Sequence, residues 1–125
     1  MTNQYKDLNR AYIARRAMFW RIRDSYLSAS LEREAILESS PPPPDGQPGG
    51  GSRGDPTLDK AARLAELDRF VVGVDAARAE IPEEYREAVW RHVLYGTRWP
   101  FIAARSTWER QERRFLANCC ARVNR

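Results

Sequence analysis

Two long segments of the chain place apolar residues at alternating spacings of three and four, as in a helix with one buried side. The first, residues 3–38, contains neither Gly nor Pro, although a Ser-Ala-Ser stretch at 28–30 is a candidate for a kink or an end. The second, residues 56–81, begins at Asp55-Pro56-Thr57, a sequence typical of a helix N-terminus. We call each row of residues on the predicted buried side a seam. The first seam consists of Tyr5, Leu8, Tyr12, Arg15, Phe19, Ile22 and Tyr26, and the second of Leu64, Leu67, Val71, Val74, Arg78 and Ile81.

Prolines and glycines fill the segment between these two helices. Neither residue supports a helix or strand in such a run, so residues 39–55 are predicted to be a disordered loop. Two seamed helices joined by a flexible loop predict an antiparallel helical hairpin. Gly73 interrupts the second helix at a cost of about 1 kcal/mol relative to alanine. Its presence there would allow another helix to approach closely.

Residues 82–125 have the pattern of a helix-turn-helix. A helix is expected from Pro82 to about Tyr95, where Gly96 ends it. The next segment is too apolar for a free loop and predicts a short helix seated on its neighbours, followed by a tight turn. Its apolar residues are Trp99, Phe101 and Ile102.

The last helix has an apolar side and an arginine-rich side. Ser106 and Glu109 have the spacing of a capping box, which predicts a helix start at Thr107. Glu112 falls on the apolar side, where Arg86 or Arg91 could pair with it. The apolar side carries Trp108, Phe115, Leu116, Cys119 and Val123, and the opposite side carries Arg110, Arg113, Arg114 and Ala117.

Positive charge is concentrated in the same region. The whole chain has a formal net charge of +4, but residues 86–125 alone carry 9 basic and 3 acidic groups, which gives +6, and all nine basic groups are arginines. Arginine binds phosphate and guanine through paired hydrogen bonds. A solvated amphipathic helix would show a similar run of charge, yet its coincidence with the helix-turn-helix pattern favours nucleic-acid binding.

Other kinds of site are not supported by the sequence. His92 has no convincing metal-ligand partner, and the adjacent Cys119 and Cys120 have no zinc-site spacing and cannot form a disulfide framework. No phosphate-binding glycine loop or nucleophile arrangement is present, so we expect neither an enzyme nor a cofactor. Without a signal-peptide core or a membrane-length apolar run, the chain is expected to be cytoplasmic.

With these motifs in view, the chain resembles the RinA-like phage transcriptional regulators and, more loosely, the ArpU group. The matching residues are Gly49-Gly50-Gly51-Ser52, Asp55-Pro56-Thr57, Lys60-Ala61, Ile81-Pro82-Glu83-Glu84-Tyr85-Arg86, Trp99, Ile102-Ala103, Ser106-Thr107 and Phe115-Leu116. The chain departs from the family pattern where Ala104-Arg105 alone separates Ile102-Ala103 from Ser106. The resemblance implies a helix-turn-helix similar to the promoter-binding region of sigma factors, and a bacterial host cell in which the protein activates phage or prophage late genes.

The sequence therefore predicts an all-α DNA-binding regulator. Its double-stranded DNA contacts would come from Arg110 and Arg114 at or near the bases and from Arg113 at a phosphate, while Ser106 caps the helix. The N-terminal hairpin would form a homodimer or contact RNA polymerase. Two alternatives remain: a DNA-packaging oligomer similar to a small terminase subunit, and a helical module whose arginines bind an acidic protein. The predicted DNA-facing residues are Arg105, Ser106, Thr107, Arg110, Arg113 and Arg114.

Overall fold

The structure, a computed structural model, describes residues 3–39 and 56–124 and is all-helical in this part of the chain. Its elements are α1 (Asn3–Glu38), α2 (Pro56–Ala79), α3 (Glu83–Tyr95) and α4 (Arg105–Val123). The predicted all-α class is confirmed. None of these helices has an apolar stretch that could cross a membrane.

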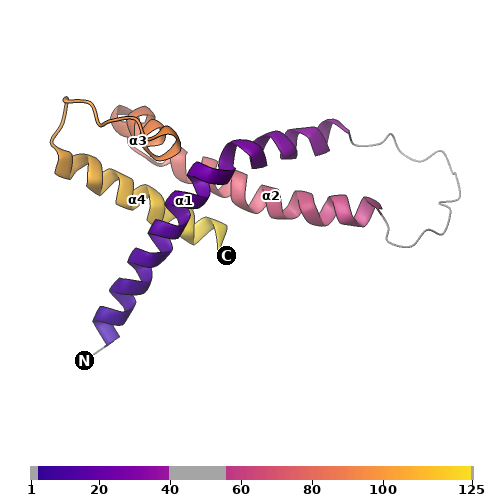
Figure 1. Cartoon of the computed structure of the whole chain (residues 1–125), viewed down its shortest axis with the longest axis horizontal. Coiled ribbons are helices and arrows are strands. Elements are labelled where there is room, and N and C mark those ends of the chain that lie inside the picture. The colour runs from indigo at the N-terminus through magenta and orange to yellow at the C-terminus, as the bar shows by residue number, and fades with distance from the viewer. Residues whose placement is uncertain (1–2, 40–55, 125) are drawn as a thin grey trace, which may run out of the picture.

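The C-terminal half of α1 runs beside α2 in the opposite direction (Figure 1). Polar contacts join the two helices: Arg63 pairs with Glu32 at 2.6 Å, Arg33 pairs with Asp68, and the Tyr26 hydroxyl donates to a carboxylate oxygen of Asp75. α1 continues through 28–30, so the helix does not end there as the serines suggested. The predicted disordered loop, residues 39–55, lies outside the described residues except for Ser39.

The core lies where α4 packs against the other three helices. Trp108, Phe115 and Cys119 of α4 are almost completely inaccessible to solvent, as are Ile22 of α1 and Val74 of α2. The seams predicted for the second half of α1 and for α2 face this core. Around them lie the other buried apolar residues: Met18, Phe19, Tyr26, Ala29, Leu67, Phe70, Val71, Ala77, Ile81, Val89, Trp90, Val93, Leu94, Leu116 and Val123.

Gly73 of α2 lies directly against α4. A Cβ atom added there would lie 3.0 Å from Cγ2 of Val123 and 3.5 Å from Cβ of Arg122. The first contact is tighter than ordinary packing, so a side chain at 73 would require Val123 to shift by a few tenths of an ångström. This agrees with the role inferred for Gly73 from the sequence.

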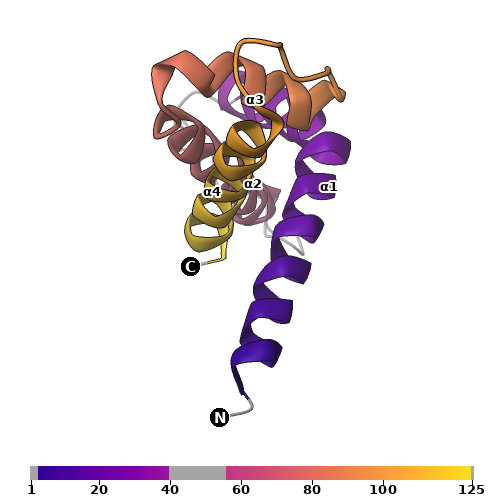
Figure 2. The same ribbon diagram turned by 90° about the vertical axis from the view of Figure 1, so that its left-hand side faces the viewer.

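The N-terminal half of α1 extends beyond the other helices (Figure 2). Met18 is the first buried residue of α1, whereas Tyr5, Leu8 and Tyr12 are exposed. The seam predicted for α1 therefore continues past the core, where none of the described helices covers Tyr5 or Leu8.

Two arginine side chains satisfy the carbonyl groups at the ends of helices. Arg23 of α1 donates to the carbonyls of Val93 and His92, at 2.9 and 2.6 Å, in the last turn of α3. Arg86 donates to the carbonyls of Ile81 and Ala79, at 3.2 and 3.0 Å, where α2 ends. The last carbonyls of a helix have no partner within the helix, so these guanidinium groups complete both ends.

The segment 96–104 between α3 and α4 is irregular, and the predicted short helix is wrong. Gly96 ends α3 with a φ of 77°, as expected, but the chain then continues in an open loop to Ala104. Phe101 and Ile102 are exposed in this loop, so only Trp99 of the three apolar residues packs against the core. The tight turn predicted at Ala104-Arg105 is also absent.

Candidate nucleic-acid interface

Aromatic side chains fix the N-terminal half of α4 to α3 and to the preceding loop. The Trp108 ring stacks on Trp99, with centroids 5.4 Å apart and planes inclined by 4°, and meets Tyr85 edge-on at 5.3 Å. The Trp108 indole N–H also donates to the Pro100 carbonyl at 3.1 Å. The predicted apolar seat of α4 is therefore confirmed, and Trp108 fixes its N-terminal half to α3 and the loop.

α4 begins at Arg105, two residues before the predicted start. Its N-cap is Ala104, and no side chain caps the helix, so the capping box of Ser106 and Glu109 is wrong. Glu109 instead pairs with Arg105 at 3.0 Å, one turn away on the same helix. Ser106 is exposed and Thr107 is half-buried.

Arg110, Arg113 and Arg114 lie exposed on the solvent side of α4. Among the described residues, no carboxylate lies within 4.0 Å of their guanidinium nitrogens, whereas such partners exist for Arg78, Arg91 and Arg122. A guanidinium without a carboxylate partner has its donors available for an anionic ligand. The structure thus separates three accessible arginines from others that are engaged within the fold.

These arginines face different neighbours. Arg113 lines a cleft of about 250 Å³ together with Arg15 and Arg16 of α1, and Glu109 and Glu112 of α4 line the same cleft. Arg114 lies on the opposite flank of α4, beside the turn between α2 and α3 that contains Pro82. Arginines therefore extend from the solvent side of α4 onto α1, with two carboxylates between them.

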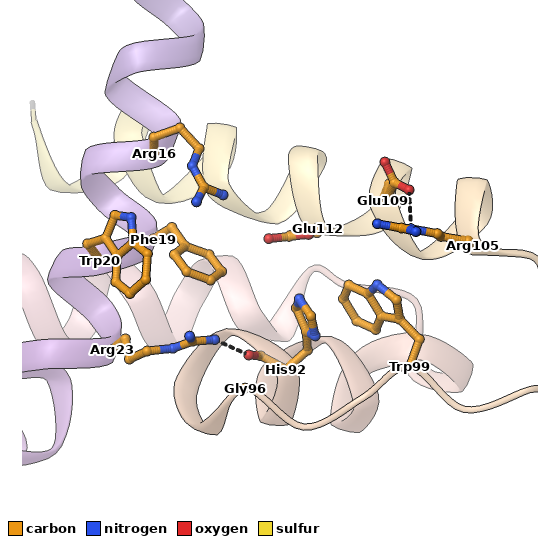
Figure 3. Close-up of a pocket in the computed structure, with 10 residues that line it drawn as sticks. All are labelled: Arg16, Phe19, Trp20, Arg23, His92, Gly96, Trp99, Arg105, Glu109 and Glu112. Atoms are coloured by element: carbon orange, nitrogen blue, oxygen red, sulfur yellow. Dashed lines mark hydrogen bonds and ion pairs between the residues drawn. The ribbon is translucent and has the colours of Figure 1, made fainter.

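Next to this side, a hollow of about 420 Å³ lies between α1, α3 and α4 (Figure 3). Arg16, Arg23 and His92 line it, and the Glu112 side chain points into it. Burial raises the pKa of Glu112, while the nearby His92 and Arg16 oppose the rise. The predicted pairing of Glu112 with Arg86 or Arg91 is wrong, because Arg86 binds backbone carbonyls and Arg91 pairs with Glu87 at 2.9 Å.

The raised pKa of Glu112 predicts a pH-dependent effect on stability. A carboxyl whose pKa is higher in the folded state destabilises the fold once pH exceeds its unfolded value, because the buried charged form is disfavoured. Glu112→Gln should therefore raise the free energy of unfolding at neutral pH. The gain should disappear as pH falls below the usual range of a glutamate. Urea unfolding at several pH values checks this, and Glu83→Gln, an exposed first-turn residue of α3, is the control.

His92 and the cysteines have structural positions. The His92 ring stacks on Trp99 with centroids 3.6 Å apart, and its Nδ1 lies 2.8 Å from the Thr97 carbonyl oxygen, so it holds the loop. Cys119 is fully buried, and burial raises the pKa of its thiol. Among the described residues, no three His, Cys, Asp or Glu side chains are grouped as metal ligands.

Sequence reasoning missed the part of α1 that borders α4. Arg15 and Arg16 lie more than ninety positions from Arg113, so no local spacing connects them. The sequence shows that both residues are basic but does not show that they lie beside Arg113.

No protein-family model, curated protein or solved structure matches this chain.

Proposed function

We propose that the protein is a sequence-specific, double-stranded DNA-binding regulator that reads DNA with α4. The observation that carries this proposal is the exposure of Arg110, Arg113 and Arg114 on a helix whose other side is locked by Trp108. A rigid helix with outward guanidinium groups suits the major groove, where arginine recognises guanine by two hydrogen bonds.

The arginines would have different tasks along the groove. Arg110, in the middle of the solvent side, and Arg114, on the flank toward Pro82, would contact base edges, while Arg113, on the flank toward α1, would bind a phosphate. At the start of α4 no side chain caps the helix, so its N-terminal end at Ser106 would also attract a phosphate, whereas the Thr107 N–H already donates to the Ala104 carbonyl at 2.9 Å. Arg105 would exchange its pairing with Glu109 for a phosphate contact.

The wider role follows from the family resemblance. It would be activation of phage or prophage late genes in the bacterial host, with α3 and α4 acting as the two helices of the DNA reader. The C-terminal half of α1 and the N-terminal half of α2, which extend away from α4 (Figure 1), would be available to contact RNA polymerase. An all-helical body with a basic terminal helix supports this proposal without distinguishing activation from repression.

A packaging oligomer remains the second candidate, because the exposed apolar residues of α1 favour assembly of several chains. Solution mass distinguishes the two. An octamer or larger ring would favour packaging, and a dimer or monomer would favour the regulator. A chain without any affinity for DNA at low salt would instead favour binding of an acidic protein.

The proposed interface can be tested by salt titration. A duplex selected from a random library would be used to measure affinity by fluorescence anisotropy at increasing salt. Since the proposal places only Arg113 at a phosphate, Arg110→Ala/Arg113→Ala/Arg114→Ala should flatten the slope of log K against log[salt] by about 0.9 units. Flattening by about 2.7 units would show that all three arginines neutralise phosphates, and an unchanged slope would contradict the interface.

A matched control removes the same charge elsewhere. Lys60, Arg63 and Arg69 are exposed and lie on α2. Their triple replacement by alanine should leave the slope almost unchanged. Equal flattening by both triple variants would show that general charge, and not α4, attracts the DNA. Replacing Arg110 or Arg114 alone by alanine should also lower the discrimination against other bases at one position of the selected site by about 1–3 kcal/mol.

A further inference from the structure

The loop between α3 and α4 presents two adjacent apolar side chains to solvent. Phe101 is 104% exposed, more than any other large apolar residue of the described chain, and Ile102 is 76% exposed. We call these two residues the loop tip. Burial of an apolar side chain stabilises a complex in proportion to the area removed from water, so the loop tip retains this free energy for a binding partner.

The backbone on both sides of the loop tip is held in place. Before it, the Trp99 ring stacks on Trp108, and the Pro100 carbonyl accepts a hydrogen bond from the Trp108 indole N–H at 3.1 Å. After it, Ala103 packs against the core, and the Ala104 carbonyl accepts the first backbone hydrogen bonds of α4. Because these contacts fix the loop before any partner binds, a contact made by the loop tip costs little ordering of the chain.

Positive charge borders the loop tip. Residues 96–108 include Arg98 and Arg105 and contain no acidic residue. Both arginines are exposed, and Arg105 pairs with Glu109 on the next turn of α4. A matching partner must therefore offer apolar groups with negative charge on either side. Duplex DNA does so in its major groove, where thymine methyl groups lie between two phosphate backbones, and an anionic bilayer does so at its surface.

The arrangement of α4 favours DNA over a bilayer. Arg114 follows Arg105 by nine residues, which is about 13 Å along the helix axis, so the exposed arginines form a row that leads away from the loop tip. A row of this kind follows a groove. In a bilayer, an aromatic ring at the base of an inserted loop belongs at the interface with water, but Trp99 is stacked against the core instead.

We propose that the loop tip packs against thymine methyl groups in the major groove, beside the base pairs that Arg110 contacts. Thymine alone among the four bases carries a methyl group in that groove, and phenylalanine recognises it by apolar contact. The loop precedes α4, so the thymine lies toward the end of the site where the N-terminus of α4 enters. Because α4 must lie in the groove for this contact to form, it rests on the proposed function.

Deoxyuridine tests the contact one methyl group at a time. Uracil pairs with adenine and keeps every hydrogen-bonding group of thymine, so the substitution removes only the 5-methyl group. The duplex is the one selected from a random library, and each thymine is replaced in turn while the dissociation constant is measured by fluorescence anisotropy. Loss of one buried methyl group should raise the dissociation constant of the wild-type chain about fourfold.

Phe101→Ser/Ile102→Ser removes the other side of the same contact. This variant should bind the unmodified duplex at least about tenfold more weakly, and it should no longer distinguish thymine from uracil. Since both side chains are exposed, its melting temperature should equal that of the wild type. Leu31→Ser is the control: Leu31 is 67% exposed on α1, and its variant should keep the full affinity and the full sensitivity to uracil.

The results that would overturn this contact differ from those that would overturn DNA binding by α4. Binding of the duplex without sensitivity to any thymine methyl group, or equal sensitivity in the wild type and the loop-tip variant, would overturn the contact alone. Cosedimentation with phosphatidylserine vesicles that is lost in Phe101→Ser/Ile102→Ser would assign the loop tip to a bilayer instead. A chain without affinity for any duplex would contradict the proposed function together with this contact.

Discussion

Replacement of Trp108 by alanine is expected to lower the free energy of unfolding by about 3–5 kcal/mol, the usual range for truncating a fully buried tryptophan. Trp108 has no exposed surface, stacks on Trp99 and donates its indole N–H to the Pro100 carbonyl. The truncation removes all three contributions and leaves a cavity between α3, α4 and the connecting loop. Since small domains have only about 5–15 kcal/mol of stability, the variant should begin to unfold well below the melting temperature of the wild type.

Equilibrium unfolding in guanidinium chloride measures this loss. Trp108→Phe should fall between the wild type and the alanine variant, because it keeps an aromatic ring but not the N–H donor. Trp20→Ala is the control, since Trp20 is 48% exposed and should cost far less. Equal losses for Trp20→Ala and Trp108→Ala would contradict the role of Trp108 as the anchor of α4.

Replacement of Arg23 by methionine is expected to cost about 2–4 kcal/mol. Methionine keeps much of the apolar stem but cannot donate to the carbonyls of Val93 and His92, which would lose two charge-assisted hydrogen bonds. The end of α3 would then fray at Gly96, against which the guanidinium packs.

Arg23→Lys distinguishes bond geometry from charge. A lysine has the same charge but no planar fork, so it should recover only part of the loss. Thermal unfolding measures both variants, with the exposed Arg69→Met as the control. Full recovery by lysine would show that charge near the helix end is sufficient and that the paired hydrogen bonds add nothing.

Periodicity predicted much of this fold. The apolar side of α4 was predicted residue by residue, because spacing along one helix reports its buried side directly. The glycine at 73 was also interpreted correctly, since glycine in mid-helix needs a reason outside the helix. The all-helical class followed from the same patterns.

The loop before α4 could not be predicted in this way. The apolar residues Trp99, Phe101 and Ile102 suggested a seated helix, yet only Trp99 is half-buried, and Pro100 contributes its carbonyl to a tryptophan on the next helix. The capping box failed for a related reason: Glu109 has a nearer partner in Arg105. Helix caps and loop conformations depend on which of several nearby partners a side chain binds, and a sequence motif does not say which partner it prefers.

The tasks of individual arginines depend on distant contacts. Arg23 binds carbonyls some seventy residues away, and Arg78 lies over the Trp90 ring at 4.5 Å from its centroid. Neither contact has a signature in the sequence. Exposure in the structure was needed to separate these arginines from Arg110, Arg113 and Arg114.

Because Gly73 lies beneath the C-terminal turn of α4, the distance between α2 and α4 depends on the lack of a side chain. A larger residue at 73 would push that turn outward, while Trp108 would hold the opposite end of α4 in place. The helix would then rotate about its N-terminal half, where Trp108 is buried. A side chain at position 73 would thus change the direction of the arginines midway along α4 without contacting them.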